Sequence, residues 1–120
     1  MVVWIMDKRR KSTRRPLKIF VDHIVGAKTH CLCVSEDVSA GGISLLGEVG
    51  PGWGKPNHVW LQFELPNENG RLIRALGELR YEREQPNGQR VRGYRFKYMA
   101  PRERNAFNRF IHSMDTSVAA

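Results

Sequence analysis

Residues 58–65, with the sequence HVWLQFEL, place an apolar residue at every second position: Val59, Leu61, Phe63 and Leu65. In an extended strand these four side chains fall on one face, and the residues between them fall on the other. This period of two is typical of a strand that is buried on one face only. Residues 58–65 therefore predict a half-buried strand.

The residues before this strand predict further strands. Residues 17–25 and 30–34 are rich in β-branched and apolar residues, and the glycine and polar residues between them suggest a hairpin. Residues 37–42 (DVSAGG) are typical of a turn, which a short apolar run at residues 43–46 follows. Residues 47–56 contain four glycines and two prolines, which cannot sustain a ladder of strand hydrogen bonds, so a loop is expected there.

The residues after this strand predict two more strands and a helix. Residues 66–70 (PNENG) indicate a turn into residues 71–84, and Asn87-Gly88 is a hairpin signal that leads into residues 89–99. Pro101 can open a helix, because its missing N–H is not needed at the first helical position. The inward positions of residues 71–84 are expected to be Ile73, Ala75, Leu79 and Tyr81. The apolar stripe of the helix is expected to be Phe107, Phe110, Ile111 and Met114.

The number and order of these elements predict the fold class. About six antiparallel strands with one C-terminal helix argue for a mainly β protein that closes into a small barrel, because closure removes exposed strand edges. The chain has 120 residues, which fits one compact domain. Hydrophobic residues make up 41% of it, which is enough to bury a core.

The charge of the chain is concentrated near its N-terminus. Twenty Lys and Arg against 12 Asp and Glu give a formal net charge of +8. Seven of the positive residues, and no acid, lie between Lys8 and Lys18, which leaves the rest of the chain at +1. Such a cluster predicts an anionic partner, although a solvated basic tail and non-specific binding to nucleic acid are the alternatives.

Several classes of protein are not expected. The longest apolar run, Val2 to Met6, is far shorter than a membrane span, and no secretory signal precedes the basic cluster. Cys31 and Cys33 are too close along a strand to form an unstrained disulfide, so a cytoplasmic location is expected. Together with His23 and His30 they lack the spacing of a zinc site. We expect no metal, no cofactor and no enzymatic activity, because no catalytic motif occurs.

Two short motifs carry the functional information. Arg10 and Arg14 form an R-x-x-x-R pattern just before the first predicted strand, and Asp37, Ser39 and Gly42 form a D-x-S-x-x-G pattern after the second. Their order and spacing resemble the two signatures of the PilZ domain family, the bacterial receptors for cyclic di-GMP. Residues 59–66 (VWLQFELP), residues 93–96 and the C-terminal helix also resemble the family, so the similarity covers almost the whole chain after residue 8.

The resemblance implies a six-stranded antiparallel β-barrel with a C-terminal helix, and it implies a set of ligand-binding residues. By position these are Arg10, Arg14, Asp37, Ser39 and Gly42. Arg9, which precedes the first motif, occupies a position that is thought to influence whether one ligand or a stacked pair binds. An arginine there favours the pair.

The residue types suit this ligand. An Arg guanidinium pairs through two parallel hydrogen bonds with phosphate or with the O6/N7 edge of guanine, and a carboxylate such as Asp37 can accept from guanine N1–H and N2–H. Ser39 can donate or accept at a tight turn, and Gly42 can supply a positive φ or let the backbone approach a ligand closely. Without the arginines, residues 37–39 could equally form an Asx-type turn.

The sequence therefore predicts a cytoplasmic binding module for cyclic di-GMP that signals to an unidentified protein in motility, pilus, exopolysaccharide or biofilm control. We expect a basic arm at residues 1–16, the barrel and helix at residues 17–115 and a tail at residues 116–120. The arm should become ordered when phosphates neutralise it. The alternatives are a small nucleic-acid-binding barrel, on which Trp53 and Trp60 could stack bases, and a PilZ-like adaptor that binds only protein.

Overall fold

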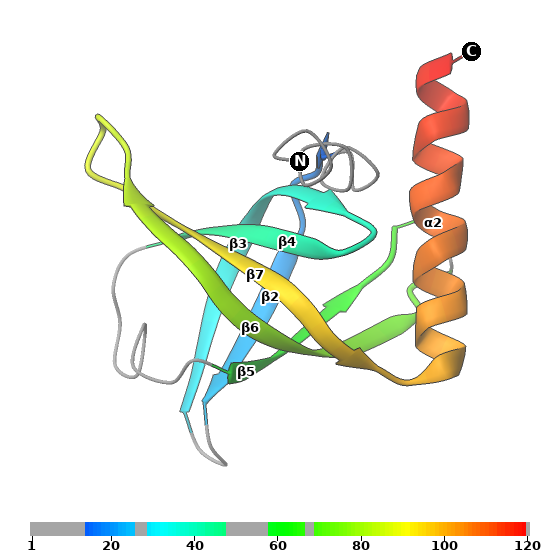
Figure 1. Ribbon diagram of the computed structural model, residues 1–120, viewed down its shortest axis with the longest axis horizontal. Helices are drawn as coiled ribbons and strands as arrows, with labels where there is room; N and C mark the ends of the chain where they lie inside the picture. The colour runs from blue at the N-terminus through cyan, green and yellow to red at the C-terminus, as the bar shows by residue number, and fades with distance from the viewer. Residues whose placement is uncertain (1–13, 26–28, 48–57, 67–68, 120) are drawn as a thin grey trace, which may run out of the picture.

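The strands of the protein close into a barrel with one helix beside it (Figure 1). The computed structural model describes residues 14–25, 29–47, 58–66 and 69–119. Its elements are β1 (Arg15–Pro16), β2 (Phe20–Val25), β3 (Thr29–Ser39), β4 (Gly42–Gly47), β5 (His58–Glu64), β6 (Leu72–Glu84), β7 (Arg90–Met99) and α2 (Pro101–Ala119).

The order of the strands confirms the predicted six-stranded barrel. Neighbouring strands follow the order β3-β2-β5-β6-β7-β4, and an additional pairing of β3 with β4 closes the ring. All the pairings are antiparallel, and the two-residue strand β1 adds to β3. Closure leaves few free strand edges, as the sequence pattern suggested.

The predicted strand at residues 17–25 is interrupted at residues 17–19. Ser35 of β3 lies opposite the interruption, where its hydroxyl accepts a hydrogen bond from the Ile19 N–H at 3.0 Å and donates one to the Leu17 carbonyl. A side-chain hydroxyl that serves two backbone groups lets the chain leave the regular ladder without losing their hydrogen bonds. β1 and β2 therefore follow the same side of β3 as one strand with a break.

The core confirms the alternation that the sequence showed. Val59, Leu61, Phe63 and Leu65 are all buried. The ring of Phe107, on α2, lies 6.0 Å from that of Phe63 and 5.2 Å from that of Phe96, measured between ring centroids. The helix thus packs against the core with its predicted apolar stripe, of which Phe110 and Ile111 are also buried and Met114 is partly buried.

Two strands differ in extent or facing from the prediction. β3 runs on to Ser39, so only Ala40 and Gly41 form the turn between β3 and β4. In β6 the register shifts twice, and after the second shift Tyr81 points outward and is 38% exposed, not inward as expected. Its ring covers Gly93, where a Cβ would meet it at 2.0 Å. A bulge changes the facing of every later residue, which a period of two does not reveal.

The ends of β6 and α2 follow the sequence signals closely. At the predicted hairpin, Gln85 N–H donates to the Gln89 carbonyl at 2.7 Å, and Gly88 takes a φ of 89°. α2 begins at Pro101, as predicted, and extends to Ala119 through the residues expected as a tail. In the part of the chain that the structure describes, no helix is both long and apolar enough to cross a membrane.

Candidate functional site

The two sequence motifs meet where β1 lies against the end of β3. The pairing of Arg15 with Val38 and of Pro16 with Asp37 carries the preceding residue, Arg14, to the side chain of Asp37. Arg14 Nη1 donates to Asp37 Oδ1 at 2.6 Å, although the two residues are 23 positions apart. Both side chains keep contact with solvent, since that of Arg14 is 41% exposed and that of Asp37 is 25% exposed. A ligand can therefore reach this ion pair.

Asp37 is held from its other side by the neighbouring strand. Ser44 lies opposite Asp37 in the pairing of β3 with β4, and its buried hydroxyl donates to Asp37 Oδ1 at 2.7 Å. The register shift between Ser35 and Asp37 sets where the carboxylate falls on the strand. Asp37 is thus a strand residue with long-range partners, and the alternative of an Asx-type turn at residues 37–39 is wrong.

Ser39 and the glycines shape the tight turn that follows. The Ser39 hydroxyl is buried and accepts the Gly41 N–H at 3.3 Å. A Cβ on Gly42 would lie 2.3 Å from the carbonyl oxygen of Tyr94 in β7. Positive φ values among the described glycines occur at Gly70 and Gly88. Gly42 therefore allows close approach between strands, and of the two expected roles, a positive φ and close approach of the backbone to a ligand, the positive φ is wrong.

The turn is also anchored by α2 and β7. Arg104, in the first turns of the helix, donates from Nη1 to the Ala40 carbonyl at 2.8 Å, and its guanidinium lies 6.0 Å above the ring of Phe96. Partial burial lowers the pKa of Arg104. The Phe96 N–H donates to the Gly41 carbonyl at 2.8 Å. The Ala40 and Gly41 carbonyls are consequently hydrogen-bonded by α2 and β7, which follow the turn in the chain.

Sequence reasoning missed Arg104 and Ser44. Arg104 precedes Phe107 by three positions and Ile111 by seven, so it lies on the apolar face of the helix, where a basic residue is unexpected. Ser44 interrupts an apolar run at residues 43–46. A polar residue on a buried face is the signal that could have identified each of them.

The structure brings four of the six predicted binding residues together: Arg14, Asp37, Ser39 and Gly42. Arg9 and Arg10 lie outside the described residues, as does Trp53. Trp60 lies on the outer face of β5 and is 39% exposed. The geometric result is one exposed Arg–carboxylate pair above a turn that β4, β7 and α2 hold in place.

The residues considered for a metal have other roles where the structure describes them. His23 is buried inside the barrel, and its Nε2 lies 3.1 Å from the hydroxyl of Tyr94. Burial lowers the pKa of His23 and raises that of Tyr94 to about 12. Cys33 is buried nearby. Across the described residues, no three His, Cys, Asp or Glu side chains gather as metal ligands would.

Comparisons with known proteins bear on the fold and on the family. The inhibitor of motility MotI (DgrA) of Bacillus subtilis superposes with a TM-score of 0.78 at 20% identity, over 91% of this chain and 52% of that one. The PilZ domain of YcgR from Escherichia coli, solved with c-di-GMP, superposes with a TM-score of 0.69 at 17% identity, over 92% of this chain and 94% of that one. At such identities these likenesses show the fold.

The chain therefore spans about half the length of MotI and nearly all of the YcgR domain. A search of curated proteins found no match. The model of the PilZ domain family matches residues 8–113, which include both motifs, the whole barrel and most of α2. A match of that extent, on a barrel whose register joins the two motifs, shows that the chain belongs to the PilZ domain family.

Proposed function

We propose that this domain is a receptor for cyclic di-GMP. The observation that carries the proposal is the ion pair of Arg14 with Asp37, which joins the two motifs at one exposed point of the barrel. The family membership and the c-di-GMP complex of the YcgR domain support the same ligand. The site contains donors and acceptors for recognition, and its proposed role is binding without catalysis.

The two side chains would recognise different parts of the ligand. The guanidinium of Arg14 would pair with a phosphate or with the O6/N7 edge of a guanine, and Asp37 would accept from guanine N1–H and N2–H. Because an exposed ion pair contributes only about 0.2–1 kcal/mol, exchanging the Arg14–Asp37 contact for ligand contacts costs little. Ser44 would keep the carboxylate in place during that exchange.

The remaining motif residues would complete the site from the N-terminal side. Arg10 would supply a second guanidinium, and Arg9 would favour a stacked pair of ligands. The seven positive charges between Lys8 and Lys18 repel one another, so binding of an anion would favour an ordered arm over residues 1–16, of which Arg15 and Pro16 already pair with β3. Ser39 and Gly42, which are both buried, would fix the shape of the turn beside which the ordered arm and the ligand lie.

The signal would pass to another protein in the bacterial cytoplasm. Arg104 links the turn at Ala40 to α2. Binding of the ligand beside the turn would therefore affect the helix at residues 101–119. The name of MotI, an inhibitor of motility, supports a role in motility, with control of pili and exopolysaccharide as further outputs of such a receptor.

A side-by-side titration tests the receptor. Calorimetry with cyclic di-GMP, GTP and a short RNA should show saturable binding of the first alone. Arg14→Ala should weaken that binding by about 1.5–3 kcal/mol, and Arg14→Lys should restore only part of it, because a single ammonium cannot make two parallel hydrogen bonds.

A matched control separates the motif arginine from general charge. Arg80 is also an exposed arginine near a carboxylate, since its Nη1 lies 3.7 Å from Glu78 Oε1, but it belongs to neither motif. Arg80→Ala should leave the affinity unchanged. Equal losses of affinity in Arg14→Ala and Arg80→Ala, or full recovery of affinity in Arg14→Lys, would show that the ligand is attracted only by the overall positive charge.

A nucleic-acid-binding barrel is the less favoured function. Two arginines on the outer face of β7 are paired with acids of β6: Arg95 with Glu78 at 2.7 Å and Arg90 with Glu82 at 2.9 Å. These ion pairs reduce the positive charge that this part of the outer face would offer to an RNA backbone. The outcome that would favour RNA is tight binding that persists at physiological salt.

A further inference from the structure

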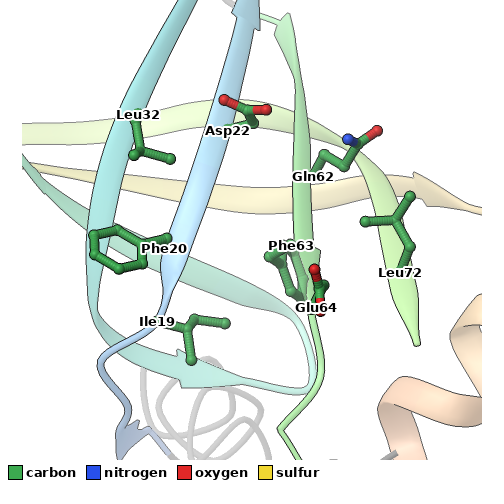
Figure 2. Close-up of a pocket in the computed structure, with 8 residues that line it drawn as sticks. All are labelled: Ile19, Phe20, Asp22, Leu32, Gln62, Phe63, Glu64 and Leu72. Atoms are coloured by element: carbon green, nitrogen blue, oxygen red, sulfur yellow. The ribbon is translucent and has the colours of Figure 1, made fainter. Parts of the chain in front are cut away.

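A groove on the outer face of the barrel lies away from the residues of the proposed ligand site. It encloses about 380 Å³ and is lined by apolar side chains from β2, β3, β5 and β6 and from the residue before β2 (Figure 2). These are Ile19, Phe20, Leu32, Phe63 and Leu72. None of the residues that form the Arg14–Asp37–Ser44 cluster takes part in it.

The side chains around this groove are unusually exposed for their type. Phe20 is 68% exposed, Leu32 is 64% exposed and Leu72 is 49% exposed. Trp60, at 39%, is also exposed on the outer face of β5 but does not line the groove. Scattered apolar residues are normal on a surface, but a contiguous set around a hollow is characteristic of an interaction site.

The groove is present because β2 and β5 separate. Their pairing consists of three residue pairs and ends at Asp22 and Gln62. Beyond that point Phe20 remains paired with Val34, and Phe63 with Ile73, each on its far side. The seam between the two strands thus opens where the groove lies. An opening between diverging strands is a shape that an extended polypeptide can enter.

Two carboxylates, of Asp22 and Glu64, lie among the apolar walls of the groove. The guanidinium of Arg74 lies beside the groove, bonded to Gln62, so the two carboxylates leave a local excess of negative charge in a chain whose net charge is +8. We propose that this groove is a docking site for an extended segment of a partner protein that presents a large apolar side chain and, within a few residues of it, Lys or Arg. The apolar side chain would cover Phe20 and Leu32, and the basic group would pair with Glu64.

Selection of peptides from a random displayed library on the intact protein tests this proposal while the partner itself is unidentified. The enriched sequences should combine an aromatic or large aliphatic residue with Lys or Arg. Leu32→Ser should weaken the binding of an enriched synthetic peptide at least about tenfold, since it removes one of the two exposed apolar side chains that the peptide would cover. Glu64→Gln should weaken it by about threefold and reduce its salt dependence.

Tyr98→Ser is the matched control, because Tyr98 is an outward-facing residue of β7, 54% exposed, that does not line the groove. It should leave peptide affinity unchanged, and melting curves should show all variants folded. Enrichment of acidic peptides, or equal affinity for the wild type and Leu32→Ser, would overturn the proposal. So would a concentration-dependent dimer that Leu32→Ser dissociates, since the groove would then hold a second copy. Addition of cyclic di-GMP is not required, so this result is independent of the proposed receptor function.

Discussion

The Arg14–Asp37–Ser44 cluster and the groove between β2 and β5 differ in what the free domain does with their side chains. In the cluster, the Asp37 carboxylate receives Arg14 at 2.6 Å and Ser44 at 2.7 Å. In the groove, Phe20 and Leu32 are more than half exposed. A carboxylate that is partly buried loses hydration and needs hydrogen-bond donors from the protein, whereas an exposed apolar side chain loses only the stabilisation that burial would provide. The polar site is therefore already assembled in the free domain. The apolar site is identified by side chains that the free domain leaves exposed.

The two regions also differ in how the sheet continues through them. The pairing of β3 with β4 persists to Ser39 and Gly42, which holds the turn beside β7. The pairing of β2 with β5 ends after three residue pairs and leaves an opening. Continuous pairing fixes the positions of short polar side chains, and interrupted pairing creates space. The same barrel thus provides a rigid site and an open one.

The largest effect should come from adding a side chain at Gly42, where β4 approaches β7 closely beside the Arg14–Asp37–Ser44 cluster. In Gly42→Ala the new Cβ would lie 2.3 Å from the Tyr94 carbonyl oxygen, a backbone atom that cannot rotate away. We expect the free energy of unfolding in urea to fall by about 2–4 kcal/mol. The control, Gly88→Ala, has positive φ but no atom within 4 Å, and it should cost about 1–2 kcal/mol. Equal losses would mean that β4 and β7 can move apart.

A smaller effect should follow from loosening the link between the turn and α2. Arg104→Gln removes the hydrogen bond to the Ala40 carbonyl and should weaken cyclic di-GMP binding by roughly 1 kcal/mol, about fivefold. Arg102→Gln, an exposed arginine in the same helical turn, is the control and should have no effect. Groove peptides should bind both variants like the wild type. A parallel loss at the groove would show that the two regions are one coupled unit.

The stability of the barrel as a whole should depend on pH through His23. This residue lies on β2 between Asp22 and Ile24, faces Tyr94 and Arg92 of β7, and has its pKa lowered below 6.5 by burial and by Arg92. The unfolded chain therefore binds a proton more readily, so the free energy of unfolding should fall as pH drops below about 6.5. The raised pKa of Tyr94, about 12, should likewise cost stability as pH rises above about 10.

His23→Gln separates this source of pH dependence from surface charge. Melting curves of the variant should lose the decline below about pH 6.5 that the wild type shows. Hydrogen exchange at the same pH values should show whether the groove and the ligand site open together. Opening of the groove strands alone would sharpen the contrast between the regions. An unchanged decline in His23→Gln would contradict the assignment.

The smallest effect expected is that of salt on ligand binding. An RNA that contacts Z phosphates loses affinity with a logarithmic slope of about −0.7Z, whereas a ligand with two phosphates that is also held through its bases should show a shallow slope. Titrations of cyclic di-GMP across a range of salt concentrations measure it. A slope as steep as that of RNA would mean that the basic residues between Lys8 and Lys18 dominate binding, and that the Asp37 cluster contributes little.

Much of the fold could be predicted because its signals are local. The alternation in residues 58–65, the Asn87-Gly88 hairpin and the helix start at Pro101 depend on residues that are neighbours in sequence. The errors lie where a distant partner decides. Ser35 interrupts the strand at residues 17–19, and the register shifts against β7 turn Tyr81 outward. Neither effect can be read from the alternation of apolar and polar residues along the affected strand.

The element types, the barrel class and the residue types of the site follow from the amino-acid order alone, since patterns of period two and 3.6 and the two motifs are properties of short segments. Which residues meet depends on the folded barrel. Arg14 reaches Asp37 across 23 positions, and Arg104 reaches Ala40 across 64. The groove exists because one strand pairing ends early. These contacts follow from the register of a closed sheet, which every strand sets jointly and no single segment encodes.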